Sequence, residues 1–272
     1  MATLADRARP RFPGDGLVTR ARYRGRNLRY RALLDAVRRH AAGDVLDVGG
    51  GAFVTDAVAA GAEFGSWTVV EPCAADLPAA ADPRVRGHVA DGCALDLPDA
   101  AYDAVLSIQV LEHVFEPIRM LSELHRVARP GAPIVVMVPQ TANAHHLPRH
   151  FQNFTRYWLE EAAERLGAEV VEYRALGGAW SSLASRLVLQ YPGMLRVAGY
   201  AHPGVHRGWL FWALFPLGLL VSALVVPLSL LLATADMEEE ANNHLIVLRR
   251  AAVPAASVPA PPVPAPHRGA TA

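Results

Sequence analysis

Short apolar segments alternate with helix-like segments along most of this chain. Five of the apolar segments are bounded by polar or turn-forming residues: Asp44 to Val48, Ser66 to Glu71, Val85 to Ala90, Tyr102 to Ile108 and Pro133 to Val138. Such alternation predicts parallel strands joined by crossover helices, and therefore an α/β protein with a doubly wound sheet. Two further strands are predicted at Ala168 to Tyr173 and His244 to Arg249.

The remaining pattern predicts one main domain between two irregular ends. Apolar residues recur at helical spacing over Asn27 to His40, and Glu160 to Leu166 indicates another helix that Thr155 can cap. We expect an irregular basic segment over residues 1–24 and a main domain over 25–250. The last residues, 251–272, are mostly Ala, Pro, Val and Ser, a composition that cannot bury enough surface to fold and predicts a disordered tail.

One long apolar run interrupts this pattern, at Trp209 to Ala233. Its 25 residues carry no charge and would reach about 37 Å as one straight helix, enough to cross a membrane. Pro216 and Pro227 each remove a backbone donor and favour a kink or break. Because strands of one sheet are predicted on both sides, a single crossing is excluded. We therefore expect an apolar helical insertion over 179–242 that dips into a membrane as a hairpin, broken near Pro216 to Gly218 or near Pro227. A buried helical pair and a dimer interface are the alternatives.

Composition narrows the partners and the compartment. The 26 basic and 26 acidic residues cancel, so the net charge gives no argument for a nucleic-acid partner, although eleven arginines fall within the first 39 residues. Cys73 and Cys93 are too few for a disulfide framework or a thiolate zinc site, so no metal is implied and a reducing compartment is expected. The N-terminus lacks the apolar core of a signal peptide, which predicts a cytoplasmic protein.

A glycine-rich turn follows the first predicted strand. In Val45 to Phe53, a buried strand leads into Gly49, Gly50 and Gly51, where missing side chains let the backbone approach a ligand. Glu71 closes the second strand twenty residues after Gly51, where a carboxylate can accept hydrogen bonds from ribose hydroxyls. These features fit a nicotinamide dinucleotide or S-adenosylmethionine equally well.

A further acid separates the two cofactors. Asp91, followed by Gly92, ends the third predicted strand, where its carboxylate can accept a hydrogen bond from an adenine amino group. This favours S-adenosylmethionine over a dinucleotide. The alternative is that Asp91 starts a turn, as acids before glycine often do.

From this point the chain resembles the class I methyltransferases that depend on S-adenosylmethionine, in particular those with a type-11 methyltransferase domain. The residues that carry the resemblance are Leu97-Pro98-Asp99, Tyr102-Asp103-Ala104-Val105-Leu106-Ser107, Gln109-Val110-Leu111-Glu112-His113-Val114 and Glu123-Leu124-His125-Arg126-Val127-Ala128-Arg129-Pro130-Gly131. The resemblance covers about residues 43 to 178 and the last strand. It implies a Rossmann-like sheet of seven strands in the order 3-2-1-4-5-7-6, with the last strand antiparallel.

The resemblance also implies roles for individual residues. Asp47 and the three glycines would surround the methionine part of S-adenosylmethionine, Glu71 would bind its ribose, and Asp91 with Gly92 would lie at its adenine. Gln109 would line the methionine pocket, and His113 would lie beside it. The family commonly has a third glycine where this chain has Phe53, so the shape of the turn stays open.

The loop after the fifth strand is the expected place for the methyl acceptor, because parallel sheets bind ligands at the carboxyl ends of their strands. It contains His145, His146 and His150. The segment resembles one in methyltransferases linked to glycan or cell-envelope synthesis, although His146, His150 and Asn153 replace residues typical of that group. Histidine has a pKa suited to a general base, so these three are the catalytic candidates. Each could instead stabilise the loop, since alignment alone accounts for much of the rate of methyl transfer from a sulfonium.

The sequence thus predicts an S-adenosylmethionine-dependent methyltransferase. The expected reaction is O-methylation of a small molecule, glycan or lipid-linked acceptor of the cell envelope. Residues 209–233 would contact the inner face of the membrane. A nicotinamide-dependent oxidoreductase and a non-catalytic membrane-associated module with a methyltransferase-like fold are the alternatives.

Overall fold

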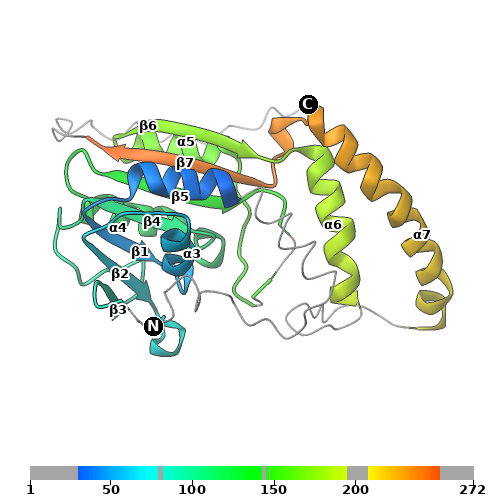
Figure 1. Cartoon of the computed structure of the whole chain (residues 1–272), viewed down its shortest axis with the longest axis horizontal. Coiled ribbons are helices and arrows are strands. Elements are labelled where there is room, and N and C mark those ends of the chain that lie inside the picture. Colours follow the sequence, from blue (N-terminus) through cyan, green and yellow to red (C-terminus); the bar gives the residue numbers. More distant parts are fainter. Residues whose placement is uncertain (1–29, 79–81, 143–144, 147, 195–207, 252–272) are drawn as a thin grey trace, which may run out of the picture.

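The computed structural model describes residues 30–78, 82–142, 145–146, 148–194 and 208–251. Its centre is a seven-stranded sheet in the order β3-β2-β1-β4-β5-β7-β6 (Figure 1). β7 pairs antiparallel with both β5 and β6, and the other neighbouring strands are parallel. The sheet order and the antiparallel last strand expected from the sequence are confirmed.

The strands agree closely with the apolar segments of the sequence. They are β1 (Asp44–Val48), β2 (Ser66–Glu71), β3 (Val85–Val89), β4 (Ala104–Ile108), β5 (Pro133–Pro139), β6 (Ala168–Leu176) and β7 (Asn243–Arg250). The longer helices are α3 (Phe53–Ala59), α4 (Pro117–Val127), α5 (Arg156–Arg165), α6 (Ala179–Met194) and α7 (Trp209–Leu232). Short 3-10 turns are η1 (Ala74–Asp76), η2 (Leu111–His113), η3 (Ala233–Ala235) and η4 (Glu238–Glu240).

Helices cover both faces of the sheet and create two apolar cores. One face packs against α4 and α5, and the other packs against α3 and a helix over residues 30–40. Thr155 caps α5 as expected, because its hydroxyl oxygen accepts the backbone N–H of Trp158 at 3.3 Å. The two layers bury the strands from both sides, which explains why β4 and β5 are apolar almost throughout.

Phe53 takes part in this core. It begins α3, is 8% exposed, and its ring lies 6.5 Å from that of Tyr30. The side chain that stands where the family commonly has a third glycine therefore points into the protein and away from the glycine turn. Phe53 adds packing between α3 and the helix over residues 30–40.

The long apolar run differs from its sequence prediction. We expected a break near Pro216 to Gly218 or near Pro227, but α7 is one continuous helix with both prolines inside it. A proline removes a single donor, and the surrounding bonds of the helix continue past it. The hairpin instead consists of α6 and α7, which pack side by side and project together beyond the sheet (Figure 1). The alternative of a buried helical pair is also wrong, because only 11% of the most apolar 18-residue stretch of this helix is buried.

Two predicted segments lie outside the described residues. These are the irregular N-terminal segment, residues 1–24, and the tail beyond residue 251. The domain limits expected from the sequence stay predictions.

We predict that Phe53→Ala lowers the free energy of unfolding by about 3 kcal/mol, since it removes a buried aromatic ring and leaves a cavity. Phe115→Ala is the matched control, because Phe115 is 78% exposed and its loss should cost less than about 1 kcal/mol. Urea unfolding followed by circular dichroism measures both variants. Equal effects of the two substitutions would contradict a core role for Phe53.

Candidate functional site

The glycine turn lies at the carboxyl end of β1 and is held by its neighbours on the sheet. Gly49 has a φ of +77°, and a Cβ there would lie 2.5 Å from a methyl carbon of Val110. The N–H of Gly51 donates to Glu71 Oε1 at 2.7 Å. The turn therefore needs glycine for both its conformation and its close contacts, and it brings the ends of β1 and β2 together.

Asp47 lies beneath this turn, fully buried in β1. Its Oδ2 accepts the indole N–H of Trp67 at 3.3 Å, whereas Oδ1 has no hydrogen-bond partner among the described residues. Burial raises the pKa of Asp47 from its usual 3.8 to about 7, opposed by the Trp67 bond and reinforced by the nearby charge of Glu71. Burial also raises the pKa of Glu71, which the Gly51 N–H partly offsets. The carboxyl groups of Asp47 and Glu71 thus border the turn, and a positively charged ligand would stabilise the charged form of each.

The Asp91 turn reaches the same edge of the sheet. A Cβ on Gly92 would lie 3.1 Å from a methyl carbon of Val48, so this turn packs against the end of β1. Asp91 Oδ1 accepts the N–H of Cys93 at 2.9 Å, which is the turn-forming role considered as the alternative. Its other oxygen has no partner among the described residues. Turn formation and ligand binding are therefore compatible at this residue.

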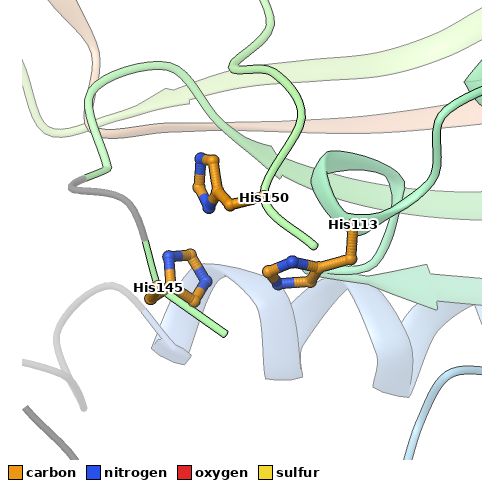
Figure 2. Close-up of side chains that lie close together, drawn as sticks. All are labelled: His113, His145 and His150. Carbon is orange, nitrogen blue, oxygen red and sulfur yellow. The ribbon is translucent and has the colours of Figure 1, made fainter. Parts of the chain in front are cut away.

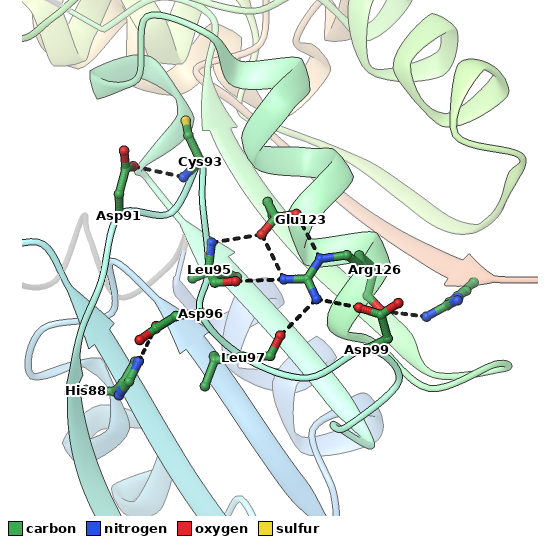
Figure 3. A network of polar contacts seen from close by, with 10 residues as sticks. His88, Asp91, Cys93, Leu95, Asp96, Leu97, Asp99, Glu123 and Arg126 are labelled. Atoms are coloured by element: carbon green, nitrogen blue, oxygen red, sulfur yellow. Dashed lines mark hydrogen bonds and ion pairs between the residues drawn. The ribbon is translucent and has the colours of Figure 1, made fainter.

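Arg126 of α4 holds the segment after this turn in place (Figure 3). Its guanidinium donates to the carbonyl oxygens of Leu95 and Leu97, each at 2.8 Å, and to Glu123 and Asp99. Glu123 in turn accepts the N–H of Leu95 at 2.8 Å. The Glu-x-x-Arg pattern of α4, which carried part of the resemblance, thus positions the loop that follows the Asp91 turn.

Gln109 follows β4 at the same edge, with a positive φ of 59° that is rare outside glycine. Its side-chain amide donates to Asn243 Oδ1 of β7 at 2.9 Å. Its neighbour Val110 contacts Gly49 of the turn. The carboxyl ends of β1, β2 and β4 and the Asp91 turn therefore converge, which brings the predicted cofactor residues together, with His113 as the exception.

His113 lies instead with the histidines of the acceptor loop. Its ring centroid is 4.8 Å from that of His145, 5.2 Å from His146 and 5.6 Å from His150. Burial lowers the pKa of His113 to about 4, and burial also lowers that of His150. All three catalytic candidates and one residue predicted for the cofactor side therefore form one cluster, which we call the histidine cluster.

Sequence reasoning gave no definite role to a buried acid beside this cluster. Glu112 is fully buried in η2, and neither carboxylate oxygen has a hydrogen-bond partner among the described residues. Its Oε1 lies 3.8 Å from His113 Nε2. Burial raises the pKa of Glu112 to about 7. Nothing in the sequence around Glu112 indicates that its side chain is buried. Its burial follows from the packing of η2, which only the structure shows.

A second polar group links the last strand to the acceptor loop. His244 of β7 is buried, its Nε2 lies 2.5 Å from Gln140 Oε1, and its Nδ1 lies 2.8 Å from the hydroxyl of Tyr173. The amide oxygen of Gln140 only accepts, so Nε2 carries the proton and Tyr173 donates to Nδ1. These residues fix the start of the acceptor loop against β7. Sequence analysis missed them because their partners lie 71 and 104 positions away.

Comparison with known proteins identifies the family. Residues 46–136 match the methyltransferase domain family. A probable S-adenosylmethionine-dependent methyltransferase of Mycolicibacterium smegmatis is 34% identical over 97 residues, which are 32% of this chain and 37% of that protein. An uncharacterized methyltransferase of Mycobacterium sp. (strain KMS) is 28% identical over 184 residues, covering 62% of this chain and 68% of that protein. The match over residues 46–136, together with the sheet order, thus supports a class I S-adenosylmethionine-dependent methyltransferase domain in this part of the chain.

The region of similarity is a minor part of some of these relatives. The match spans little more than a third of the first two curated relatives. Among solved structures, the [4+2]-cyclase SpnF is similar with a TM-score of 0.52 and 20% identity, covering 81% of both chains. That similarity concerns the fold alone, and the fold hosts more than one kind of reaction.

We predict that raising the pH from about 5 to 8 destabilises the protein through Asp47. Its pKa is near 7 when folded and near 3.8 when unfolded, so the folded state keeps a proton that the unfolded state loses. The stability therefore falls by about 3 kcal/mol between pH 5 and pH 8, which is part of the roughly 4 kcal/mol that the whole shift in pKa represents. In Asp47→Asn this loss should be absent, as measured by thermal unfolding across the pH range without cofactor.

Asp103→Asn provides a comparison of opposite sign. Hydrogen bonds from the Asp44 N–H and from Arg129 lower the pKa of Asp103, so its contribution is present at neutral pH and is lost as the pH falls through the folded pKa. The Asp103 variant should thus differ most from the native protein above pH 5. Matching pH profiles for the native protein and Asp47→Asn would contradict the assignment of Asp47.

Proposed function

We propose that this protein transfers a methyl group from S-adenosylmethionine to a hydroxyl oxygen of an acceptor near the inner face of the membrane. The acceptor would be a lipid-linked or other cell-envelope small molecule or glycan. The observation that carries the proposal is the convergence of the glycine turn, Glu71, Asp91 and Gln109 on one edge of the sheet, with the histidine cluster beside them.

The chemistry of these groups supports the cofactor assignment. Glu71 uses one oxygen to fix the turn, and its other oxygen remains for ribose hydroxyls. Asp91 likewise keeps one oxygen for an adenine amino group. Asp47 lies directly beneath Gly50, where its carboxylate would attract the positively charged methionine part of the cofactor. Gly92 lets the Asp91 turn pack closely against Val48 at the end of β1. Gln109 lies at the same edge of the sheet, at the end of β4.

The histidines of the acceptor loop supply the other half of the reaction. A hydroxyl nucleophile loses its proton as its oxygen attacks the methyl carbon and the carbon–sulfur bond breaks. His145, His146 and His150 are the imidazole groups on this loop that could receive that proton. Alignment of the acceptor oxygen with the methyl carbon and the sulfur would also raise the rate of methyl transfer.

Membrane contact is supported by the surface of α7. α6 packs against one side of this helix, where Ser222 and Ser229 are buried, and the remaining sides expose leucine, valine and tryptophan side chains. Leu219, Leu220 and Val221, at neighbouring positions, are 44%, 59% and 47% exposed. Successive positions point about 100° apart, so the exposed side chains spread over more than one narrow stripe. A second copy would cover one face of the helix, whereas lipid would cover every side that α6 leaves open. We therefore propose a lipid surface as the occupant.

The base of the α6–α7 hairpin joins this surface to the candidate site. Asp236, just after α7, accepts the N–H groups of Trp180 and Ser181 at 2.8 and 3.0 Å, so it caps the start of α6. Gln140, which begins the acceptor loop, donates to the carbonyl oxygen of Glu239 at 2.7 Å. A hairpin seated on a membrane would thus hold the acceptor loop close to the lipid headgroups.

We predict that the full-length protein binds S-adenosylmethionine and does not bind nicotinamide dinucleotides, as measured by calorimetry. Glu71→Gln should weaken the cofactor roughly 10- to 100-fold, because it removes a charged acceptor of hydrogen bonds. Glu63→Gln, an exposed acid away from the turn, should have no effect. Transfer of labelled methyl groups into membrane extracts then tests the reaction.

The outcomes separate the proposals. Binding of the cofactor without any transfer would support a non-catalytic module and contradict the enzyme. A dinucleotide bound more tightly than S-adenosylmethionine would overturn the cofactor assignment. Labelled product that is stable to mild base and gives up its methyl group to hydriodic acid supports an ether formed at a hydroxyl. Label released as methanol by mild base shows a methyl ester, formed at a carboxylate oxygen, and contradicts a hydroxyl acceptor.

We predict that the protein floats with vesicles of phosphatidylethanolamine and phosphatidylglycerol. Replacement of Leu220, Leu224 and Leu231 by Gln should reduce the bound fraction roughly 100-fold, at about 1 kcal/mol for each apolar side chain. The matched control replaces Val89, Phe115 and Tyr157, which are exposed on the sheet domain, by Gln. If the native protein stays in solution as a dimer that the first variant dissociates, α7 is an interface between copies and the membrane proposal is wrong.

A further inference from the structure

The histidine cluster has the geometry of a metal site as well as that of a base. His113, His145 and His150 each offer one ring nitrogen, and these three atoms lie within 4.8 Å of one another. Their rings come from η2 and from two points of the acceptor loop, and they face a common space (Figure 2). Such convergence of three imidazoles from separate segments is the arrangement by which proteins hold zinc and related ions.

The hydrogen bonds of His113 fix which nitrogen faces the cluster. Its Nδ1 lies 2.7 Å from the carbonyl oxygen of Arg149. A carbonyl oxygen only accepts, so Nδ1 carries the proton and Nε2 keeps its lone pair. Metal-binding histidines commonly donate their second N–H to a backbone carbonyl in this way, which holds both the ring and its tautomer.

His150 is held in the opposite tautomer by a side-chain amide. Asn153 Nδ2 donates to the carbonyl oxygen of Ala142 at 3.1 Å, which leaves Asn153 Oδ1 facing His150 Nε2 at 3.2 Å. His150 Nε2 must then carry the proton. Its Nδ1 is buried and has no hydrogen-bond partner among the described residues. A buried lone pair without a donor is costly unless a ligand occupies it.

Glu112 gives an independent reason to expect a cation here. Both of its oxygens are buried without partners among the described residues, and one lies 3.8 Å from the Nε2 of His113. An isolated buried carboxylate is expensive, and proteins compensate it with a positive charge or a metal. No arginine is paired with Glu112 in the described part of the chain, whereas a cation on His113 Nε2 would lie next to it.

We propose that His113, His145 and His150 bind one divalent transition-metal ion of the zinc class, leaving an open position for the acceptor oxygen. Zinc–nitrogen bonds of 2.0–2.1 Å place ligand atoms about 3.3 Å apart in a tetrahedral site. The three nitrogens must therefore approach by no more than about 1.5 Å, which rotation of the side chains on the loop allows. The two cysteines take no part, since a three-histidine site needs no thiolate.

The role of this ion rests on the proposed methyl transfer. A zinc-class ion lowers the pKa of an oxygen that it binds, so an acceptor hydroxyl would lose its proton more readily. The oxygen then forms a bond to the methyl carbon, and the electrons of the carbon–sulfur bond return to sulfur. His146 lies outside the ligand set, with its ring 5.2 Å from that of His113, and is the histidine left to receive the proton.

The binding test uses untagged full-length protein, freed of metal with a chelator and titrated with Zn²⁺ or Co²⁺, without cofactor or acceptor. We expect one equivalent to bind, with the visible absorption of Co²⁺ in a site of low coordination number. His113→Asn and His150→Asn should each weaken the metal at least about 100-fold. Asn153→Ala should weaken it roughly 10-fold through the orientation of His150. His88→Asn, which alters a histidine paired with Asp96, is the control.

Circular dichroism and the affinity for S-adenosylmethionine show whether each variant folds. The proposed metal site would be overturned if His113→Asn and His150→Asn left the affinity for Zn²⁺ and Co²⁺ unchanged. It would also be overturned if His88→Asn weakened metal binding as much as they do. Transfer activity that survives removal of the metal would overturn its catalytic role. Because metal binding is measured without substrates, a failure of the methyltransferase proposal alone would leave this result unaffected.

Discussion

The position of β7 between β5 and β6 is the constraint on which the rest of this molecule depends. β7 runs antiparallel to both, so Asn243 pairs with Pro139 at the end of β5 and with Leu176 at the end of β6. The chain between β6 and β7 must therefore leave and return at the edge where the parallel strands end. The same strand supplies Asn243 to Gln109 and His244 to Gln140, so it closes the sheet and positions the segments that follow β4 and β5.

Two buried acids at this edge have carboxylate oxygens without hydrogen-bond partners in the part of the chain that the structure describes. One oxygen of Asp47 and both oxygens of Glu112 are of this kind, and each acid lies beneath a segment with a proposed positive ligand. Desolvation raises the pKa of both, so a bound cation would restore the charged form. Glu123 and Asp99, in contrast, are paired with Arg126 and hold the loop after the Asp91 turn. This difference in environment is the reason for proposing Asp47 and Glu112, and not Glu123 or Asp99, as groups that face a positive ligand.

The sequence predicted those features that depend on local pattern. β1 and β2 were placed at their observed limits, because each is a short, mainly apolar segment that ends at a glycine turn or at an acid. The convergence of Gly51 and Glu71 followed from the fold that their spacing implied. In contrast, the path of α7 through Pro216 and Pro227 depends on whether the neighbouring helical bonds survive the loss of two donors. Neither that outcome nor the inward direction of Phe53 is visible in a hydrophobic pattern.

The position of His113 among the histidines likewise depends on packing that a sequence pattern does not show, and it has a consequence for the acceptor. Its neighbours in sequence carry the cofactor-side resemblance, but the one-turn η2 rotates His113 toward Arg149 and the acceptor loop. The histidine cluster thus joins the end of β4 to the loop after β5, while the hairpin base is tied to that loop through Gln140. α7, 24 residues long, would reach about 36 Å. An acceptor with a lipid tail along α7 and its hydroxyl at the histidines would then meet the proposed cofactor pocket at the same edge of the sheet, without leaving the membrane surface.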